Sequence, residues 1–518
     1  MNLEITVKNY RCFGDLVPAR IKLARGTTAL IGSNNSGKST LLRFFYELRP
    51  LWERAAADDS ACLSLFENGF TLPHLPTLRA QEQLFHRHNH NDLVIGLRIL
   101  RPPGARAETG SGPDEIFVVI SRKNLHCQAR FDHETRLALP EITAPHFLDK
   151  WRHVFLSLSR TLYISPFRGF DDPGPPWQSL DLKGGGFPGH VHLLQQTDGA
   201  MHRVCEEIKS LFRMKSFTMR VLPGTDTLEF ETDGSHLPLE ELGSGLQQVI
   251  VILTHALLKK PDYILIDEPE CHLHASLQAD FVMTLNGFAR KGLVFASHNI
   301  GLARSAGDRI YNVSRDEVRN CTTLAEYRSG QRLSETLGEL NFSAQQQSGC
   351  TKLLLVEGPT EIKAIRQLLR KMDAEKNIVL LPLGGGSMIA PNRDDELAET
   401  KKICRDVYAL IDSEKNRPEE DVAADRIAFR RSCEKNGIAC HILERRSFEN
   451  YFSAATIEQH YGRRARRLGP FDDVREIYPA WQKTDNWKLM REMPLEEMAT
   501  TDLGRFLRFV VEAPCHVK

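Results

Sequence analysis

The sequence predicts an α/β protein made of two successive regions, each with a parallel sheet covered by helices. Apolar, β-branched segments alternate with helical segments in both halves of the chain, which is the pattern of parallel sheets. The runs YILID (263–267) and GLVFA (292–296) are apolar throughout, as strands buried on both faces are. A polar stretch at 326–350 precedes the second α/β region, which begins near Lys352.

Composition narrows the class of protein. The chain has 518 residues, of which 41% are hydrophobic and 26% charged, enough for several folded domains. Its formal net charge is zero, so any contact with nucleic acid has to come from local basic patches. The eleven cysteines include no Cys-x-x-Cys pair, which argues against a zinc ribbon and against a secreted disulfide scaffold.

No segment of the sequence predicts export or membrane insertion. The N-terminus, MNLEITVKNYRCFGDL, lacks an apolar signal core, and no run of about 18 apolar residues occurs. We therefore expect a cytoplasmic protein without a membrane domain of its own.

Local patterns predict the order of elements and domains. In the first half we expect strands at 3–7, 27–32, 93–100, 115–121, 217–222 and 227–231, helices at 38–48 and 192–212, and a Gly/Pro-rich loop at 168–190. In the second half we expect strands in KLLLVEG, NIVLLPL, DVYALID and ACHIL, with helices at 361–372 and 425–436. The expected domains are a first domain at 1–167 and 236–325, an insert at 168–235 to which a family resemblance assigns a dimerisation role, a linker at 326–350, and a second domain with a helical extension at 351–518.

Residues 32–39 (GSNNSGKS) match the full P-loop pattern and lie between a predicted strand and a predicted helix. The glycines let backbone N–H groups curl around phosphate oxygens. The Lys38 ammonium reaches the β- and γ-phosphates, and the Ser39 hydroxyl binds Mg²⁺. The predicted ATP-binding residues of this loop are Asn34, Asn35, Ser36, Gly37, Lys38, Ser39 and Thr40.

The apolar strand at 263–267 ends in two acids, as a Walker B strand does. It brings Asp267 to the Mg²⁺ side of the nucleotide, where Glu268 orients the attacking water. Such a strand end is common by itself, and the complete P-loop upstream favours the functional interpretation. We therefore predict Asp267 as an Mg²⁺ ligand and Glu268 as catalytic.

Two further motifs resemble those of ABC ATPases. LGSGLQQ (242–248) resembles the ABC signature. At the start of its helix, Ser244 and free N–H groups would bind the γ-phosphate held by a partner subunit. The order Gly-Ser departs from the Ser-Gly-Gly-Gln of transporters, which weakens a transporter interpretation. His298, after the strand at 292–296, resembles the switch histidine that contacts the γ-phosphate.

The opening VKNYRCF resembles the start of RecF- and SMC-like ATPases, with Arg11 as a candidate near the nucleotide. PECHLHASLQ resembles the D-loop of the same branch, so His272 and His274 are expected at a dimer contact and not at a metal. HRHNHN (86–91) is expected to be a polar loop, and Gln81 is a candidate for the Q-loop glutamine. The resemblance implies an ABC-type (RecF/SMC-like) ATPase domain with a helical insert, acting as a homodimer or higher homo-oligomer.

Acidic residues follow three segments of the second region. Glu357 ends an apolar strand, and Glu361 lies one helical turn further on. VYALIDSE places Asp412 and Glu414 two apart at another strand end, so both can face one site. RRSFENYF adds Ser447 and Glu449. Oxygen ligands of this kind suit Mg²⁺ or Mn²⁺, and two such ions can activate water against a phosphodiester.

This set resembles the Toprim domain, and the Ser-x-Glu-Asn-Tyr segment resembles that of the OLD (overcoming lysogenisation defect) family. The resemblance covers nearly the whole chain, since that family also carries an N-terminal ABC ATPase. It implies a two-metal nuclease that nicks or cleaves DNA, often in defence against phage. The implied metal ligands and catalytic residues are Glu357, Glu361, Asp412, Glu414, Ser447 and Glu449. Glu414 departs from the usual Asp, which puts that ligand in doubt.

The same family uses a lysine near the scissile phosphate. The resemblance makes Lys483 the first candidate and Lys488 the second, although either is equally well a surface lysine. Arg445, Arg446 and the cluster GRRARRLG offer phosphate contacts, or else form a solvated surface.

The leading hypothesis is an ATP-driven, metal-dependent DNA nuclease that uses ATP and Mg²⁺, or Mn²⁺ at the second centre. A second hypothesis is a DNA-clamping or sensor ATPase whose Toprim-like domain binds without cleaving. A third is a toxin held in check by a partner protein or RNA of a defence system.

Overall fold

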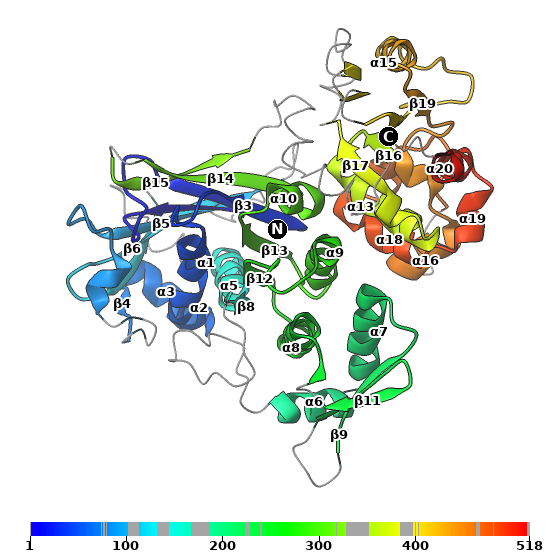
Figure 1. The fold of residues 1–518 in the computed structure, drawn as a ribbon. Coiled ribbons are helices and arrows are strands. Elements are labelled where there is room, and N and C mark those ends of the chain that lie inside the picture. Colours follow the sequence, from blue (N-terminus) through cyan, green and yellow to red (C-terminus); the bar gives the residue numbers. More distant parts are fainter. Residues whose placement is uncertain are drawn as a thin grey trace. The chain divides into compact units, whose positions relative to one another are not determined.

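The computed structural model describes residues 2–73, 75, 78, 80–101, 113–131, 145–166, 187–197, 199–222, 228–238, 241–316, 319–327, 352–383, 397–398, 400–401, 404–462, 467–479 and 481–514. The chain divides into two compact units. Unit 1 comprises residues 1–299 and 309–327, and unit 2 comprises residues 300–308 and 328–518. Figure 1 shows their helices and strands.

The central sheet of unit 1 has six strands in the order β15-β14-β3-β13-β12-β8. All neighbours pair in parallel except β15, which pairs antiparallel with β14 at one edge. The strands predicted at 27–32, 263–267 and 292–296 form its middle, buried on both faces. The bounds are β3 Thr27–Ile31, β8 Thr161–Ile164, β12 Tyr263–Asp267, β13 Gly292–Ser297, β14 Arg309–Asp316 and β15 Cys321–Glu326.

A second six-stranded sheet of unit 1 is antiparallel, so the expectation of parallel sheets throughout was wrong here. Its order is β2-β1-β5-β6-β7-β4. In β1, exposed or half-buried residues alternate with buried ones, as in antiparallel sheets with one solvated face. The bounds are β1 Asn2–Lys8, β2 Ala19–Leu23, β4 Phe70–Thr71, β5 Leu93–Leu100, β6 Glu115–Ile120 and β7 His126–Arg130.

One hydrophobic core joins both sheets of unit 1. Helix α1 (Lys38–Glu47) contributes Leu41 and Phe45 to a cluster that also contains Ile5 of β1 and Leu265 of β12. The helix that follows the P-loop is thus fixed by packing against both sheets. The same cluster includes residues of α2 (Arg49–Ala56), α3 (Asp59–Glu67), the 3₁₀ turn η1 (Gln81–Leu84) and α5 (Pro145–Ser159).

The insert contains two helices and a small antiparallel sheet, and not the single helix predicted at 192–212. The helical conformation is interrupted before α7, where Gly199 has a left-handed φ of 66°. Residues 168–186 of the predicted loop lie outside the described residues, and α6 begins within the remainder. The bounds are α6 Phe187–Gln196, α7 Ala200–Phe212, β9 Phe217–Val221, β10 Leu228–Thr232 and β11 Ser235–Pro238, followed by α8 Ser244–Lys259 and α9 Ala275–Asn286.

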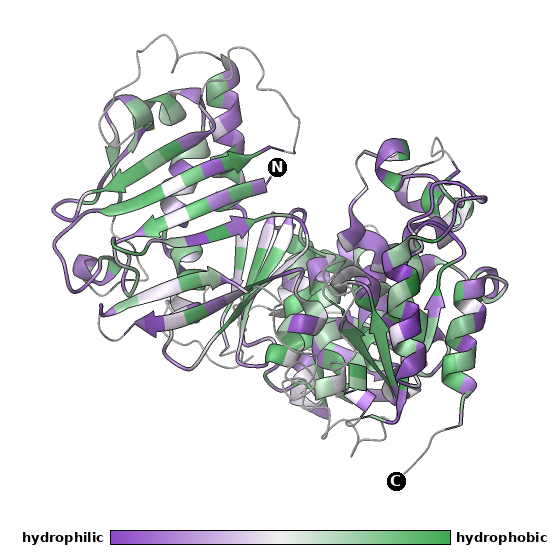
Figure 2. Cartoon of the chain, turned by 90° about the horizontal axis from the view of Figure 1, so that it is seen from above, coloured by the Kyte–Doolittle hydropathy of each residue, from purple (hydrophilic) through white to green (hydrophobic). Residues whose placement is uncertain are grey.

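Unit 2 is built on a four-stranded, wholly parallel sheet in the order β17-β16-β18-β19. Leu354 and Val356 of β16 enter one hydrophobic cluster, and Leu353 and Leu355 enter another. Both faces are therefore covered, which explains the uninterrupted apolar run KLLLV; Figure 2 shows the apolar colouring of such strands against the more polar helices.

Helices and short turns of unit 2 accompany the four strands of this sheet. The bounds are α10 Ile300–Ala306, β16 Lys352–Val356, α13 Pro359–Lys371, η3 Glu375–Asn377, β17 Ile378–Pro382, β18 Asp406–Ile411, α15 Ala424–Lys435, β19 Ala439–Ile442, η4 Phe448–Tyr451, α16 Ala454–Tyr461, α17 Val474–Ile477, η5 Lys483–Asp485, α18 Asn486–Glu492, α19 Leu495–Ala499 and α20 Asp502–Glu512. Among the described residues, no helix has both the length and the apolar character needed to cross a membrane.

Candidate functional site

The P-loop of unit 1 is shaped by glycines that approach other backbone closely. It connects β3 to α1, and a Cβ built at Gly32 would lie 2.1 Å from the carbonyl oxygen of Val313. Gly37 has φ 112° and a Cβ there would lie 3.0 Å from the Cys12 sulfur. Thr322 further fixes the loop, because its hydroxyl donates to the Ser36 carbonyl at 2.8 Å. The loop is therefore held in the curled form that a phosphate needs.

Lys38 is folded back onto its own loop. Its ammonium donates to the carbonyl oxygens of Gly32 (2.8 Å) and Ser33 (3.0 Å) and lies 3.4 Å from Nδ1 of His298. Burial lowers the pKa of Lys38, against the opposing effect of Glu268 and neighbouring acids. The Lys38 ammonium thus lies within the loop. To contact the phosphates of a nucleotide, it would have to give up its hydrogen bonds to these carbonyl oxygens.

The Walker B acids and the switch histidine meet at one edge of the sheet. The pairing of Asp267 with Ala296 in β12 and β13 brings the following residues together. Asp267 is buried, and Oε1 of Glu268 lies 2.7 Å from Nε2 of His298. Burial first, and then Glu270, raises the pKa of Glu268 to about 8. Glu268 therefore keeps its proton to a higher pH than an exposed glutamate does, next to His298 and the P-loop lysine.

Glu270 belongs to this network, although the sequence interpretation missed it. Its Oε1 accepts hydrogen bonds from the Ser297 hydroxyl and from the His298 N–H, the latter at 3.3 Å. Glu270 thereby fixes the backbone that carries His298. Its position two residues after Glu268 in YILIDEPE was the signal that could have identified it.

Ser244 lies exposed at the start of α8. Next to it, a Cβ at Gly245 would lie 2.5 Å from the carbonyl oxygen of His272. The signature helix therefore packs directly on the segment that resembles a D-loop. His274 caps α9 through its ring nitrogen.

The other predicted positions of unit 1 either make structural contacts or lie at the surface. Arg11 pairs with the buried Glu47 at 2.5 Å, and His86 contacts the Arg11 carbonyl at 2.7 Å. Gln81 is exposed in η1. Asn34, Asn35 and Ser33 are exposed on the P-loop, while Ser39 and Thr40 are half-buried at the start of α1.

The predicted acids of unit 2 follow the carboxyl ends of adjacent strands. Val356 pairs with Leu410, so Glu357 and Asp412 leave the sheet next to each other. The Asp412 N–H donates to Oε2 of Glu357 at 3.1 Å. Asp412 in turn accepts the Phe448 N–H at 3.1 Å, which ties the turn η4 to β18. Burial and the nearby acids, led by Glu361, raise the pKa of Asp412.

Glu361 and Glu449 are buried carboxylates of this centre, and each has one oxygen, Oε2, without a hydrogen-bond partner. The Lys483 ammonium lies 3.2 Å from Oε1 of Glu449, and the Asn486 amide donates to the same oxygen at 2.9 Å. Burial works to raise the pKa of Glu449, but the charge of Lys483 and the hydrogen bonds to the carboxylate together outweigh it, and the pKa is lowered. Burial works to lower the pKa of Lys483, but the charge of Glu449, followed by those of Glu361 and Asp412, raises it.

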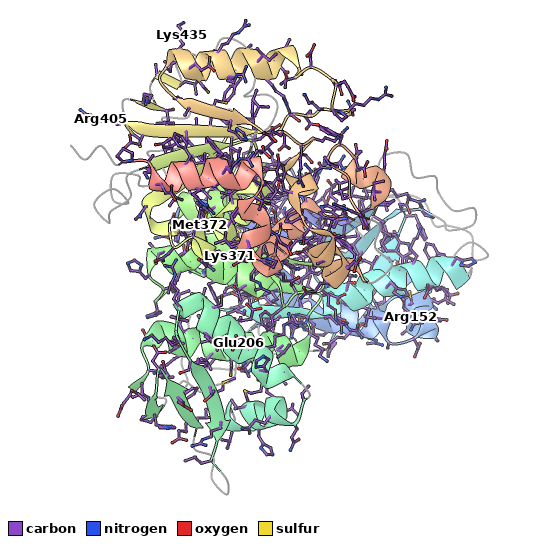
Figure 3. The ribbon with its side chains drawn as sticks, turned by 90° about the vertical axis from the view of Figure 1, so that its right-hand side faces the viewer. Arg152, Glu206, Lys371, Met372, Arg405 and Lys435 are labelled. Atoms are coloured by element: carbon purple, nitrogen blue, oxygen red, sulfur yellow. The ribbon has the colours of Figure 1, made fainter. Side chains whose placement is uncertain are left out.

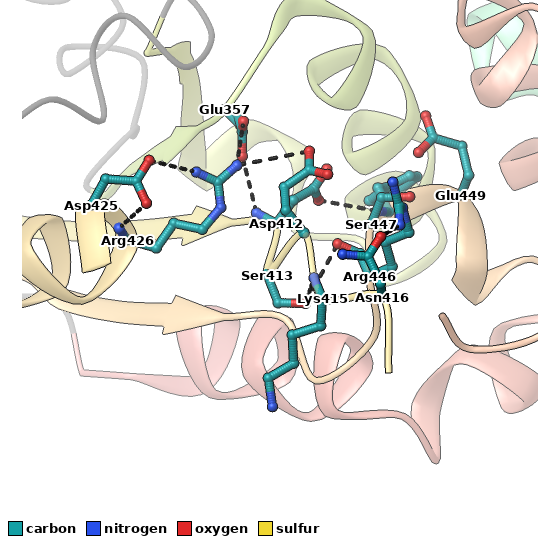
Figure 4. A network of polar contacts seen from close by, with 12 residues as sticks. Glu357, Asp412, Ser413, Lys415, Asn416, Asp425, Arg426, Arg446, Ser447 and Glu449 are labelled. Carbon is teal, nitrogen blue, oxygen red and sulfur yellow. Dashed lines mark hydrogen bonds and ion pairs between the residues drawn. The ribbon is translucent and has the colours of Figure 1, made fainter. Parts of the chain in front are cut away.

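Glu357 and Glu414 face a different cation. Nη2 of Arg426, on α15, lies 3.2 Å from Oε1 of Glu357 and 3.8 Å from Oε1 of Glu414 (Figure 4). Asp425 pairs with Nη1 at 3.5 Å. Glu414 has φ 57° and its side chain is 47% exposed. The sequence interpretation did not include Arg426, since an arginine on a polar helix carries no local signal.

Ser447 caps the turn η4, which carries Glu449. Its hydroxyl and N–H both donate to Oδ1 of Asn450, at 2.8 and 3.0 Å. Lys488, the second candidate lysine, pairs with Asp485 at 3.1 Å. Lys483 is therefore the candidate lysine that lies within the carboxylate centre.

The donor set suits a hard divalent cation, but the side chains are not yet arranged around one. Among the described residues, no three His, Cys, Asp or Glu side chains are grouped tightly enough to hold a metal ion. The two unpartnered buried oxygens of Glu361 and Glu449 nevertheless fit a cation, because a buried acceptor without a partner is costly. A bound ion would draw these carboxylates together in place of the Lys483 ammonium.

The predicted phosphate-binding arginines are partly occupied. Arg445 donates to the Asn450 carbonyl at 2.7 Å, and Arg446 pairs with Asp473 at 3.1 Å. Three arginines of the cluster GRRARRLG, at 463, 464 and 466, lie outside the described residues. Arg405 and Lys435 project from the surface of unit 2 (Figure 3).

The fold and site of unit 1 define an AAA/ABC-type ATPase domain, and comparison with known proteins supports this class. Residues 1–49 match the family model "AAA ATPase domain". Residues 142–304 match the model "AAA domain, putative AbiEii toxin, Type IV TA system". The ATP-binding part of the prediction is thereby supported, while neither model reaches residues 328–518.

Among curated proteins, the chain is similar to the zinc import ATP-binding protein ZnuC of Pseudomonas savastanoi pv. phaseolicola, with 25% identity over 159 residues. The match covers 28% of this chain and 53% of that protein, so the chain spans about half the length of this relative.

Among solved structures, the SMC head domain from Thermotoga maritima has a TM-score of 0.34 and 14% identity, covering 63% of this chain and 99% of that one. An Smc head domain derived from Pyrococcus furiosus has a TM-score of 0.37 and 14% identity, covering 66% and 100%. Both likenesses are too distant to carry an argument about this chain.

Proposed function

We propose that this chain is an ATP-regulated DNA endonuclease or nickase that depends on divalent metal and acts in defence against phage, as an OLD-like ATPase–Toprim protein. The observation that carries the proposal is the pair of buried, unpartnered carboxylate oxygens on Glu361 and Glu449, in one centre with Asp412 and Lys483. Such an arrangement is expensive in a protein that binds no cation there.

Glu361, Asp412 and Glu449 would hold Mg²⁺ or Mn²⁺. The ion would supply positive charge to a phosphodiester and lower the pKa of a bound water. Lys483 pairs with Glu449, and its ammonium would contact a phosphate oxygen of the strand once released. The Phe448 N–H holds Asp412 in place through a 3.1 Å hydrogen bond, so that acid is oriented by the fold before any ligand arrives.

ATP is proposed to regulate this centre through unit 1. The P-loop and Lys38 would bind the phosphates, and Glu268 with His298 would orient the attacking water. Ser244 is exposed at the start of its helix, where it can meet nucleotide held by a second copy of the chain. ATP binding would therefore pair two chains and gate access of DNA to the nuclease centre.

A role in defence is supported by one of the family models. The model that matches residues 142–304 is described by the name of a toxin of a type IV toxin–antitoxin system. That description belongs to the family. For this chain we propose the same biological setting, with a partner protein or RNA left to be identified.

The proposal is tested with Glu361→Gln, which keeps the size of the side chain and removes its charge. Wild-type protein with Mg²⁺ or Mn²⁺ is expected to nick supercoiled plasmid DNA, and Glu361→Gln to lose nicking while keeping ATP hydrolysis. Glu458→Gln is the matched control, because Glu458 is exposed on α16 of the same unit. Cutting at the wild-type rate by Glu361→Gln would refute the assignment.

A second candidate function is a DNA-clamping or sensor ATPase whose unit 2 binds without cleaving. It is favoured by the absence of a ready metal cluster among the described residues, and by the two cations, Lys483 and Arg426, that already pair with the acids. ATP-dependent retention of DNA, without strand cleavage under any metal, would establish this function in place of the first.

A further inference from the structure

The two ends of the carboxylate centre differ in their charge partners. Both oxygens of Glu357 are engaged, one by Arg426 at 3.2 Å and the other by the Asp412 N–H at 3.1 Å. Glu414 also points to Arg426, at 3.8 Å. In the view of Figure 4, Arg426 and Glu449 lie on opposite sides of Asp412. Glu357, Glu414 and Asp425 therefore share one buried cationic partner within the protein.

At the end of the centre away from Arg426, two carboxylate oxygens accept no hydrogen bond. Oε2 of Glu361 and Oε2 of Glu449 are buried and have no hydrogen-bond partner. Glu449 is 0% exposed and Glu361 7%. Water cannot satisfy these oxygens at the surface, so a cation that enters the centre gains most from binding here.

The two cations also differ in how easily they can leave. The Arg426 side chain is only 7% exposed, whereas that of Lys483 is 38% exposed. A guanidinium stays charged at any physiological pH and binds carboxylates through a fixed, planar fork. An ammonium on a flexible stem can swing into water at little cost. An entering metal ion therefore displaces Lys483 and leaves Arg426 in place.

We infer that Arg426 takes the place of a second metal ion in this centre, so that unit 2 binds a single divalent cation at the end formed by Glu361, Asp412 and Glu449. Arg426 is then a positioning residue that fixes Glu357 and Glu414. This inference rests on the proposed function, and it departs from the two-ion centre that the sequence resemblance implies.

The number of bound ions tests the inference without any nuclease assay. Mn²⁺ binding to the full, nucleotide-free chain is titrated by calorimetry, and free Mn²⁺ is followed by electron paramagnetic resonance. The double variant Glu357→Gln/Glu361→Gln serves to subtract ions bound elsewhere. We expect one Mn²⁺ per wild-type chain in this centre. Two ions would overturn the inference and leave the nuclease proposal intact, whereas none would overturn both.

Arg426→Met removes the guanidinium and keeps most of the buried side-chain volume. It should free Glu357 and Glu414 and raise the count to two ions per chain. Arg426→Lys, which keeps a charge, should stay at one. Arg430→Met is the matched control, because Arg430 is exposed one turn further along α15, and it too should stay at one. A count of one for a folded Arg426→Met would also overturn the inference.

A second pair of variants keeps the inference testable if Arg426→Met does not fold. Glu357→Gln should still bind one Mn²⁺, because Glu357 faces Arg426, whereas Glu361→Gln should lose the ion. A centre that holds two ions would lose one in each of the two variants. Equal losses in both would therefore contradict the assignment of Arg426.

Discussion

The two centres of this chain are built from different parts of the polypeptide. In unit 1, one continuous loop makes the cradle, and its form depends on backbone contacts such as that of Gly32 with Val313. In unit 2, side chains from five separate segments meet, and the form of the centre depends on which acid faces which cation. Glu361 and Glu449 keep open oxygens, whereas Glu357 is held by Arg426.

This difference explains why the P-loop of unit 1 can be recognised from the sequence, whereas the carboxylate centre of unit 2 can be recognised only in part. A backbone cradle requires particular glycines at fixed spacing, so the requirement is written in consecutive residues. A carboxylate centre requires acids at strand ends, but acids at strand ends are common. Which of them binds a ligand depends on neighbours that are distant in the sequence.

The largest expected effect concerns the cradle itself. Lys38→Ala removes the ammonium that now donates to the Gly32 and Ser33 carbonyls and that has to neutralise phosphate. Steady-state ATP hydrolysis should fall by about 10²- to 10³-fold, the usual cost of losing one transition-state contact. Lys259→Ala, at the exposed end of α8, should leave the rate unchanged. Hydrolysis near the wild-type rate by Lys38→Ala would place the nucleotide elsewhere.

Much of the fold followed from local patterns. The strands at 263–267 and 292–296 are apolar throughout and form the middle of the parallel sheet. The second sheet of unit 1 was predicted wrongly as parallel, because the direction in which strands pair depends on long-range topology. The strands β14 and β15 were missed, since the polar residues of RIYNVSRD conceal their pattern.

The site was predictable where residues act through their own segment. The sequence placed Glu357 and Asp412 at the ends of two strands, and the structure pairs these strands and joins the two residues by a hydrogen bond. Arg426 could not be found in this way, because its position is set by how α15 packs. The part played by each acid of unit 2 remains a prediction until ions are counted.

The second prediction concerns the support behind the carboxylate centre. Asp502 accepts hydrogen bonds from the Tyr451 hydroxyl at 2.7 Å and the Glu444 N–H at 2.9 Å, and it lies 2.9 Å from Nε2 of His441. Burial alone would raise the pKa of Asp502, but these partners outweigh it and lower the pKa to about 2. Tyr451 ends the turn that carries Glu449, so Asp502 holds that turn.

A lowered pKa gives stability above the unfolded pKa that is lost as the pH falls through the folded pKa. With an unfolded value of about 3.9, Asp502 should contribute about 2 to 3 kcal/mol at neutral pH, lost between about pH 4 and pH 2. Asp502→Asn should therefore lower the free energy of unfolding in urea most at pH 7, and the difference from wild type should shrink as the pH falls. Asp421→Asn, at an exposed position, is the control. A difference that is constant with pH would exclude an ionised Asp502 as its cause.

The smallest effect separates the two ways of building a centre, through a pair of glycines. A Cβ at Gly358 would lie 2.6 Å from Oε2 of Glu361, the free end of a side chain. Gly358→Ala should therefore move that carboxylate and weaken Mn²⁺ binding about tenfold, with little change in thermal stability. A Cβ at Gly32 would lie 2.1 Å from the backbone oxygen of Val313, and Val313 belongs to β14, which pairs with β3.

Neither backbone can move at Gly32 without disturbing that pairing, so Gly32→Ala should lower the stability of unit 1 by about 1 to 3 kcal/mol. Mn²⁺ binding to the nucleotide-free protein should not change. Both variants are studied by thermal unfolding and by Mn²⁺ titration. Gly358→Ala should change the ion affinity and keep the stability, whereas Gly32→Ala should change the stability and keep the ion affinity. If Gly358→Ala lost stability and kept its ion affinity, the carboxylate centre would also depend on its backbone, because only a side chain can yield to a new methyl group without unfolding its surroundings.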